Sequence, residues 1–517
     1  MKSNIPDNLI LNPSAHSAGN PFIIAPVRTL SYQQYSGLVK SVLPALKKRY
    51  RSGDRIAVLS GNSVEYLILL FAMWRLKIVP VLLNTRWPAQ YLSGNLKKIK
   101  CHQIILSSEF SSMILKGLSK VLLEDLVVLS DPDTPLIPLL QVKFNLNQCA
   151  SIIFTSGSTA QPKAVLHTLG NHYFNAQGSN QNIRLGPGDR WLLSLPLYHV
   201  GGMGIVFRTF LSGAALVIPD PVKGLEKSIR DQRISHLSLV TTQLQRLLQN
   251  ESLIPYLGKL KAILLGGGPI PYPLLKKCYR LKLPVFVSYG STEMASQITT
   301  TGEKDRLKKW KTAGKVLSHR NVKISQQGEI LVKGKTLYKG YIQSGKLKKV
   351  TDKTGWFHSG DLGQLDKDGY LTVFGRKDNM FISGGENIQP EEIEQCIRNI
   401  AGVEEVVVVP VEDREFGMRP VAIIKMQGDN KYQTTHKSLP GRRTGQKKKY
   451  KIQNTKYRLQ EMKVYLKRVL PGFKVPDYFL PWPEMAGKGL KISRAEFRLW
   501  AAGELRKKEN DKRQKGN

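Results

Sequence analysis

The residues with the clearest chemical capacity lie between positions 151 and 163. An apolar run, Ser151 to Phe154, predicts a buried strand. The next five residues, Thr155 to Thr159, offer hydroxyl and backbone N–H donors, and Lys163 adds a cation. Such a loop suits a polyphosphate. Because no Ser or Thr follows Lys163, it is not the Gly-x-x-x-x-Gly-Lys-Ser/Thr loop of ordinary nucleotide hydrolases.

Further polar and glycine-rich motifs follow apolar runs farther along the chain, and these runs predict strands at 191–195, 262–265 and 284–288. In identity and in order the motifs resemble those of the adenylate-forming superfamily, which includes acyl-CoA synthetases, luciferases and peptide-synthetase adenylation domains. The motifs that carry this resemblance are Pro196–Gly202, Gly266–Pro269, Tyr289–Glu293, Gly355–Asp361, Gly375–Asp378 and Ser383–Asn387.

Three stretches narrow the resemblance to the o-succinylbenzoate–CoA ligases of menaquinone biosynthesis. They are Trp191–Arg208, Ala313–Arg320 and Gly489–Arg494. The resemblance implies an acid–thiol ligase that uses ATP, Mg²⁺ and CoA. In such a ligase a carboxylate attacks the α-phosphate of ATP, and the CoA thiol then displaces AMP from the acyl-adenylate. A CoA ligase for another aryl or fatty acid is the alternative within the same reaction class.

The same resemblance assigns the nucleotide-binding residues. Glu293 would hold Mg²⁺, as suits a carboxylate beside phosphates, and Thr292 would contact the α-phosphate. Asp361 would accept the ribose hydroxyls, and Arg376 would meet ribose or phosphate oxygens. The β- and γ-phosphates would lie on Thr155, Ser156, Gly157, Ser158, Thr159 and Lys163, and the adenine beside Gly266, Gly267, Gly268, Tyr289 and Gly290.

A second group of residues would handle the acid, the adenylation step and CoA. Lys491 is the expected catalytic lysine, with Lys488 as its rival. His199 would either gate the entry of the acid or hold the substrate carboxylate in place. The alternative interpretation is that His199 is a buried core histidine. Arg208 is a hypothesis for the second carboxylate of the acid, because a buried carboxylate needs a cationic or N–H partner.

Other positions are assigned to the acyl pocket, the hinge and CoA. Gly267 and Gly290 would also border the acyl group, Asp378 would act as the hinge, and Gly384 and Gly385 would contact CoA. Ala160 and Ala164 stand where the superfamily more often has glycine, which is a departure from its usual loop.

The alternation of apolar runs with amphipathic segments up to about residue 370 predicts an α/β protein with parallel sheets covered by helices. The resemblance adds a β-subdomain and a small mobile C-terminal α+β domain, together the acyl-adenylate synthetase fold. We expect a large AMP-binding domain at 1–375, a hinge at 376–378, and the small domain at 379–505. A basic, polar stretch at 428–457 is expected to be a disordered insertion, and 506–517 a basic tail.

Composition bounds the remaining possibilities for the 517-residue chain. No apolar run is long enough to cross a membrane, and no signal core follows Met1, so a cytoplasmic location is expected. The four cysteines show no metal-binding spacing. The net charge of +39 leaves open a nucleic-acid-binding protein, or contact with nucleic acid or an anionic membrane through 431–451. Because the lysines are spread along the whole chain, a general bias toward lysine, which anionic substrates would tolerate, is favoured instead, and 431–451 is expected to be a solvated loop. A non-catalytic relative and a homo-oligomer are further open alternatives.

Overall fold

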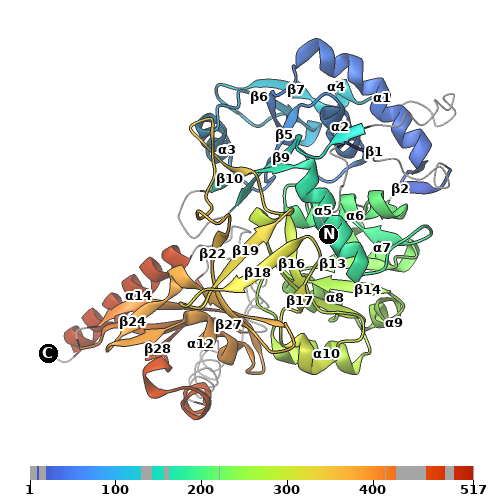
Figure 1. Cartoon of the computed structure of the whole chain (residues 1–517). Coiled ribbons are helices and arrows are strands. Elements are labelled where there is room, and N and C mark those ends of the chain that lie inside the picture. Colours follow the sequence, from blue (N-terminus) through green and yellow to red (C-terminus); the bar gives the residue numbers. More distant parts are fainter. Residues whose placement is uncertain are drawn as a thin grey trace, which may run out of the picture. The chain divides into compact units, whose positions relative to one another are not determined.

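The computed structural model describes residues 8–10, 19–129, 143–155, 162–220, 222–413, 415–426, 461–483 and 494–515. The chain divides into two compact units (Figure 1). The first contains 1–270, 274–359 and 364–372, and the second contains 271–273, 360–363 and 373–517. The predicted domain limits at 375 and 379 remain predictions.

The first unit contains an eight-stranded sheet that carries the strand before the phosphate loop. Its five strands β9, β5, β4, β6 and β7 are parallel, whereas β10, β20 and β21 extend the sheet antiparallel from β9. In sheet order the strands are β21 (Lys346–Lys348), β20 (Gly340–Gln343), β10 (Lys163–Thr168), β9 (Cys149–Thr155), β5 (Val79–Leu82), β4 (Arg55–Leu59), β6 (Gln103–Leu106) and β7 (Ser119–Leu122).

A nine-stranded sheet carries the glycine-rich motifs. Six strands from β15 to β2 are parallel, and β16, β17 and β3 are antiparallel at the two edges. In sheet order they are β17 (Lys315–Val316), β16 (Ser296–Thr300), β15 (Val285–Ser291), β14 (Ala262–Leu265), β13 (His236–Leu239), β11 (Arg190–Leu192), β12 (Ala215–Val217), β2 (Pro21–Ala25) and β3 (Arg28–Ser31).

The predicted α/β fold with helix-covered parallel sheets is therefore confirmed, with antiparallel strands added at one edge of the eight-stranded sheet and at both edges of the nine-stranded sheet. Short hairpins and returning segments pair at these three edges, and antiparallel edge strands of this kind are common in α/β proteins. The strand expected at 262–265 is confirmed, whereas the one expected at 191–195 ends at Leu192. Pro196 soon follows, and proline cannot donate to a strand ladder.

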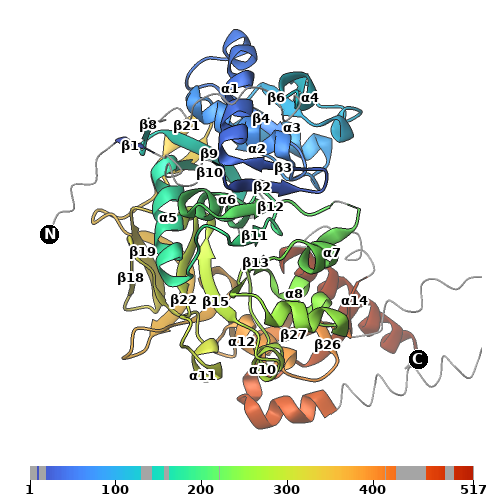
Figure 2. The same ribbon diagram turned by 90° about the vertical axis from the view of Figure 1, so that its right-hand side faces the viewer.

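Helices between the sheets form the main core of the first unit. Helix α2 (Val64–Arg75) is buried on nearly every face, and its Trp74 donates a hydrogen bond to the Ala150 carbonyl at 2.7 Å. Helices α5 (Leu169–Asn182) and α6 (Val200–Ser212) pack against each other (Figures 1 and 2). Within the described residues, no helix is long and apolar enough to cross a membrane. The other helices are α1 (Tyr32–Arg49), α3 (Ala89–Lys98), α4 (Leu123–Leu126), α7 (Gly224–Asp231), α8 (Thr241–Leu247), α9 (Ile254–Gly258), α10 (Tyr272–Arg280) and α11 (Leu307–Trp310).

The expected β-subdomain is a four-stranded sheet in the order β18-β19-β22-β23. Its strands are β18 (Arg320–Ile324), β19 (Glu329–Gly334), β22 (Phe357–Leu365) and β23 (Leu371–Arg376). Both hairpins predicted in this region, at 323–333 and 363–374, are confirmed. Outside the sheets, β1 (Asn8–Ile10) pairs with β8 (Lys143–Asn145).

The second unit has its own core around a three-stranded sheet. Strands β26 (Val403–Asp413), β27 (Gly417–Met426) and β28 (Tyr478–Pro481) pack against helix α12 (Pro390–Arg398) and a helical stretch at 461–469. Helix α14 (Arg494–Lys515) packs on β26 and continues through most of the segment predicted to be a tail. The predicted insertion at 428–457 lies outside the described residues.

Candidate active site

The two ends of the predicted phosphate loop lie side by side. Thr155, the last residue of β9, pairs with Lys163, the first residue of β10. Ser156, Gly157, Ser158 and Thr159 lie outside the described residues. The antiparallel pairing therefore presents an exposed ammonium group next to the threonine that begins the loop.

Tyr341 links Lys163 to the predicted metal ligand, and no sequence motif marks this tyrosine. The Lys163 Nζ atom lies 5.4 Å from the centroid of the Tyr341 ring, and the Tyr341 hydroxyl donates to Glu293 Oε1 at 2.9 Å. Strand β20 brings Tyr341 here because it pairs with β10, with Val165 opposite Tyr341. Burial, with the Glu293 charge adding to it, raises the pKa of Tyr341, so the phenol stays a hydrogen-bond donor.

Glu293 fits the requirements of Mg²⁺ in a nucleotide site. It lies in a 3₁₀ turn, η4 (Thr292–Met294), directly after β15, and it is half-buried. Among the described residues there is no cluster of three or more metal-binding side chains. Mg²⁺ commonly takes one or two protein carboxylates and completes its shell with phosphate and water oxygens. One carboxylate beside a phosphate loop therefore suffices.

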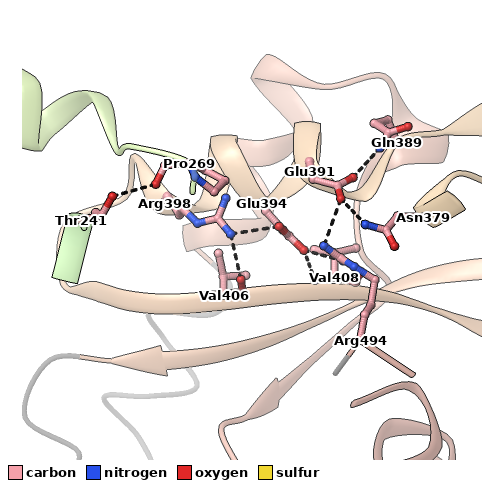
Figure 3. Close-up of polar contacts among 10 residues, drawn as sticks. All are labelled: Thr241, Pro269, Asn379, Gln389, Glu391, Glu394, Arg398, Val406, Val408 and Arg494. Carbon is pink, nitrogen blue, oxygen red and sulfur yellow. Dashed lines mark hydrogen bonds and ion pairs between the residues drawn. The ribbon is translucent and has the colours of Figure 1, made fainter. Parts of the chain in front are cut away.

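The predicted adenine-binding glycines occupy the carboxyl ends of neighbouring parallel strands. Gly266 follows β14, and a Cβ there would lie 2.9 Å from the Ser288 carbonyl oxygen of β15. Gly267 has φ +83°, which favours glycine. The end of this loop is held by Thr241, whose hydroxyl donates to the Pro269 carbonyl at 3.1 Å (Figure 3). Open crevices at the carboxyl ends of parallel strands are the usual ligand sites of α/β sheets.

Gly290 lies where no larger residue fits. A Cβ at this position would lie 2.0 Å from the carbonyl oxygen of Ser296 on the neighbouring strand. Tyr289 precedes it in β15 and is half-buried. The glycine thus allows β16 to return closely past the Tyr289–Glu293 motif.

His199 and Arg208 lie on the same helix in opposite environments. His199 is the N-cap of α6 and is exposed, which excludes the interpretation as a core histidine. Its ring contacts that of Tyr198 at 4.8 Å between centroids. Arg208 lies two turns further along and is only 1% exposed.

The Arg208 guanidinium has unused hydrogen-bonding capacity. Its Nε and one terminal nitrogen have no hydrogen-bond partner among the described residues. The group lies 5.2 Å above the Trp191 ring, and Gly204 leaves room for it, since a Cβ there would lie 3.0 Å from the guanidinium. Burial lowers the pKa of Arg208 to about 9, so it remains charged at neutral pH. A buried, charged and incompletely paired guanidinium indicates a site for an anion.

In the second unit, Arg376 bridges the predicted ribose ligand and the predicted hinge. Its two terminal nitrogens donate to Asp361 at 3.1 Å and to Asp378 at 2.9 Å. Partial burial opposes the positive charge, but the two carboxylates outweigh it and raise the pKa of Arg376. A Cβ at Gly360 would lie 2.6 Å from the guanidinium, so glycine permits this bridge.

Gly384 and Gly385 form the two-residue turn of a hairpin between β24 (Phe381–Ser383) and β25 (Glu386–Ile388). Their φ angles are +57° and +83°, as a type I′ turn requires. Turn geometry alone therefore explains both glycines, and contact with CoA remains a prediction.

Lys491 and Lys488 lie outside the described residues, which resume at Arg494. Arg494 is anchored by two carboxylates of α12: it donates to Glu394 Oε1 at 2.6 Å and to Glu391 Oε1 at 3.3 Å (Figure 3). Glu394 is 2% exposed and also accepts from the Val408 amide and from Arg398. This buried ion-pair cluster fixes the chain shortly after the predicted catalytic lysine.

Removing the central carboxylate of this cluster should destabilise the second unit strongly. Glu394→Ala would remove the counter-charge of Arg398 and leave Arg494 with Glu391 alone, a loss of about 3–5 kcal/mol. Hydrogen exchange of the β26 and β27 amides would measure it separately from the first unit. Glu404→Ala, which removes a more exposed partner of Lys425, should cost less than about 1 kcal/mol. Equal losses of stability in Glu394→Ala and Glu404→Ala would contradict the role of Glu394 as the central carboxylate of the buried cluster.

Comparison with known proteins agrees with this arrangement. The family described as AMP-binding enzyme matches residues 12–342. The 2-succinylbenzoate–CoA ligase of Oceanobacillus iheyensis is 37% identical over 389 residues, covering 73% of this chain and 80% of that protein. The corresponding ligase of Bacillus licheniformis is 36% identical, covering 72% and 80%.

Solved structures extend the likeness across nearly the whole chain. The o-succinylbenzoate coenzyme A synthetase of Bacillus subtilis in complex with AMP has a TM-score of 0.77 at 28% identity, covering 94% of this chain and 97% of that one. The same synthetase in complex with the acyl-adenylate intermediate has a TM-score of 0.76 at 28% identity, covering 94% and 96%. The fold is thus that of the adenylate-forming enzymes, and the chain belongs to the 2-succinylbenzoate–CoA ligase family of AMP-binding enzymes.

Proposed function

We propose that this chain is an ATP-dependent acid–CoA ligase that converts 2-succinylbenzoate to its CoA thioester in menaquinone biosynthesis, releasing AMP and pyrophosphate. Its relatives carry the name of this activity, and solved relatives contain AMP, ATP with magnesium, or the acyl-adenylate. The observation within this chain that carries the proposal is the buried guanidinium of Arg208.

Arg208 matches the chemistry of an acid with two carboxylates. One carboxylate reacts, and the other must be buried with the rest of the acyl group. A buried carboxylate requires a charged or N–H partner, and an arginine with unused donors supplies both. A simple fatty acid or benzoate would leave this cation without a partner.

Adenylation proceeds by attack of the reacting carboxylate oxygen on the α-phosphorus, with pyrophosphate as the leaving group. Such reactions are accelerated mainly by positioning and by countering negative charge. Thr155 and Lys163 hold the β- and γ-phosphates together with Ser156, Gly157, Ser158 and Thr159. Thr292 donates to the α-phosphate. Glu293 holds Mg²⁺, which when bound neutralises the phosphate charge.

The remaining residues position the nucleotide, the acid and CoA. Gly266, Gly267, Gly268, Tyr289 and Gly290 border the adenine and the acyl group, and His199 steadies the reacting carboxylate. Asp361 accepts from the ribose hydroxyls, and Arg376 contacts the nucleotide. Lys491, or its rival Lys488, stabilises the developing charge during adenylation.

In the second half-reaction the CoA sulfur attacks the acyl carbonyl and AMP leaves. Gly384 and Gly385 contact CoA, and Asp378 is the hinge. Its ion pair with Arg376 supplies a contact that a change of backbone angles at the hinge would alter. A cytoplasmic location and a homo-oligomeric state remain predictions.

Pyrophosphate release without CoA tests the proposal. With ATP and Mg²⁺, we expect release with 2-succinylbenzoate and little with benzoate or a medium-chain fatty acid. Neither benzoate nor the medium-chain fatty acid has a second carboxylate. Release with another acid alone would retain the reaction class and overturn the substrate. If folded protein that binds ATP released no pyrophosphate with any of the acids, the result would favour a non-catalytic relative.

A further inference from the structure

The backbone just after Thr292 and Glu293 is strained. Ala295 has φ +55° and Ser296 has φ +126°, although neither is glycine. Such conformations are unfavourable for residues other than glycine and persist only where the surrounding structure holds them. The strain therefore raises the question of what holds this turn.

Groups from three other segments of the first unit hold the carbonyls of the turn. His167 Nε2 lies 2.7 Å from the Thr292 oxygen, and the Tyr338 amide donates to the Glu293 oxygen at 2.7 Å. Asn175 Nδ2 donates to the Met294 and Gln297 oxygens at 3.0 Å each. The turn is thus clamped at four carbonyls by partners that are distant in sequence.

The contact from His167 is the end of a directed chain of buried hydrogen bonds. A carbonyl only accepts, so His167 Nε2 carries the proton and its Nδ1 is the acceptor. Ser151 Oγ, 3.3 Å from Nδ1, therefore donates to His167 and accepts from His172 Nε2 at 2.9 Å. With its proton on Nε2, His172 has a bare Nδ1 atom, which has no hydrogen-bond partner among the described residues.

Both histidines stay neutral. Each is fully buried, and burial lowers the pKa of His167 to about 4 and that of His172 well below its usual value. The His172 ring stacks on Phe207, the residue before Arg208, at 5.0 Å between centroids. The stacking contact and the hydrogen bonds together therefore connect helix α6, which carries the proposed acid-binding Arg208, to the turn that carries the proposed metal ligand Glu293.

We propose that His167 is a positioning residue for adenylation: through its hydrogen bond to the Thr292 carbonyl it fixes the Thr292–Glu293 peptide, with Ser151 and His172 holding its ring and tautomer. This role rests on the proposed function. His167 touches neither nucleotide nor metal; it acts through Thr292 and Glu293. Sequence patterns could not reveal it, because a histidine within an apolar strand is ordinarily a core residue.

Two substitutions of His167 separate positioning from packing. His167→Leu fills the space but cannot donate to Thr292, whereas the amide of His167→Gln can. We expect His167→Leu to lower kcat for pyrophosphate release about 10–50-fold, with the KM for the acid within about 2-fold, and His167→Gln to recover most of the loss. Tyr35→Phe is the matched control, since it removes a buried hydrogen bond of 2.8 Å to the Leu67 carbonyl.

Direct ATP binding supplies a readout that does not depend on the acid. By calorimetry, His167→Leu should weaken ATP binding in the presence of Mg²⁺ about 5–20-fold, and Tyr35→Phe should leave it unchanged. If no acid reacts but this difference in ATP binding persists, the proposed substrate fails and the positioning role stands. The role of His167 would be overturned if His167→Leu and Tyr35→Phe changed kcat and ATP affinity equally. It would also be overturned if His167→Leu and His167→Gln lost kcat equally.

A milder variant covers the case in which His167→Leu does not fold. Ser151→Ala removes the donor to His167 Nδ1, so the imidazole ring is held less firmly in its contact with the Thr292 carbonyl. We expect a smaller loss in the same direction, about 2–5-fold in kcat. Nitrogen-15 spectra of labelled histidine should show a neutral Nε2–H tautomer for His167, as the contact with the Thr292 carbonyl requires, both in the unaltered protein and in Ser151→Ala. An Nδ1–H tautomer in the unaltered protein would overturn the proposal.

Discussion

Arg208→Met is expected to raise the KM for 2-succinylbenzoate by about 10²–10³-fold, because it removes a buried, charge-assisted contact worth about 3–4 kcal/mol. The maximal rate should fall much less, since the second carboxylate lies away from the reacting carbon. Pyrophosphate release at varied acid concentration measures both quantities. Arg208→Lys should be intermediate, because lysine keeps the charge but loses the planar fork.

The same substitution should stabilise the unliganded protein. Two buried donor atoms of Arg208 have no partner among the described residues, and methionine removes them while filling much of the volume. A gain of about 1–3 kcal/mol, seen as a rise of roughly 1–4 °C in Tm, is expected. A buried cation that lowers the stability of the unliganded protein in this way is explained by the binding of a ligand.

Arg320 is the matched control for this prediction. It is also buried, at 4% exposed, but its nitrogens donate to the carbonyls of Ser318, Gln297, Phe174 and Asn175. Arg320→Met should therefore lower Tm, since it removes these buried hydrogen bonds. If Arg208→Met lowers Tm as Arg320→Met does, or leaves the KM for the acid unchanged, then Arg208 is a structural arginine and not a substrate ligand.

The sequence predicted those parts of the site that lie within one motif. The strand before the phosphate loop, the strand before Gly266 and the hairpin at 323–333 all follow from local apolar patterns and turn residues, and the structure confirms them. Arg208 was named as a chemical hypothesis for binding the second carboxylate; the structure places it in a buried position, and the binding role remains a prediction. Local pattern sufficed because each of these features is decided by neighbours in the chain.

The parts of the fold and of the site that depend on contacts between residues far apart in the sequence could not be predicted. Tyr341 reaches Glu293 only because β20 pairs with β10, far away in sequence. His167 and Asn175 act on a turn more than a hundred residues distant. The antiparallel sheet edges are likewise a property of pairing, which a list of apolar runs does not specify. These residues are ordinary in their local context, so no motif marks them.

Glu293→Gln is expected to reduce kcat/KM for pyrophosphate release by about 10²–10³-fold and to shift its Mg²⁺ dependence to higher concentration. An amide keeps the size of the side chain but binds a hard divalent cation far less well. Titration with Mg²⁺ at fixed ATP measures the shift. An unchanged Mg²⁺ dependence would remove Glu293 from the metal site.

Tyr341→Phe tests whether the phenol acts through Glu293. We expect a loss of about 5–20-fold, because the carboxylate loses the donor that orients it. In the Glu293→Gln background the same change should matter little, which corresponds to a coupling energy of about 1–2 kcal/mol between the two sites. Tyr370→Phe is the matched control, since its hydroxyl also donates to a carboxylate, that of Asp305, at 2.6 Å. Additive losses, or an equal loss in Tyr370→Phe, would show that Tyr341 supports the fold rather than the metal-binding carboxylate.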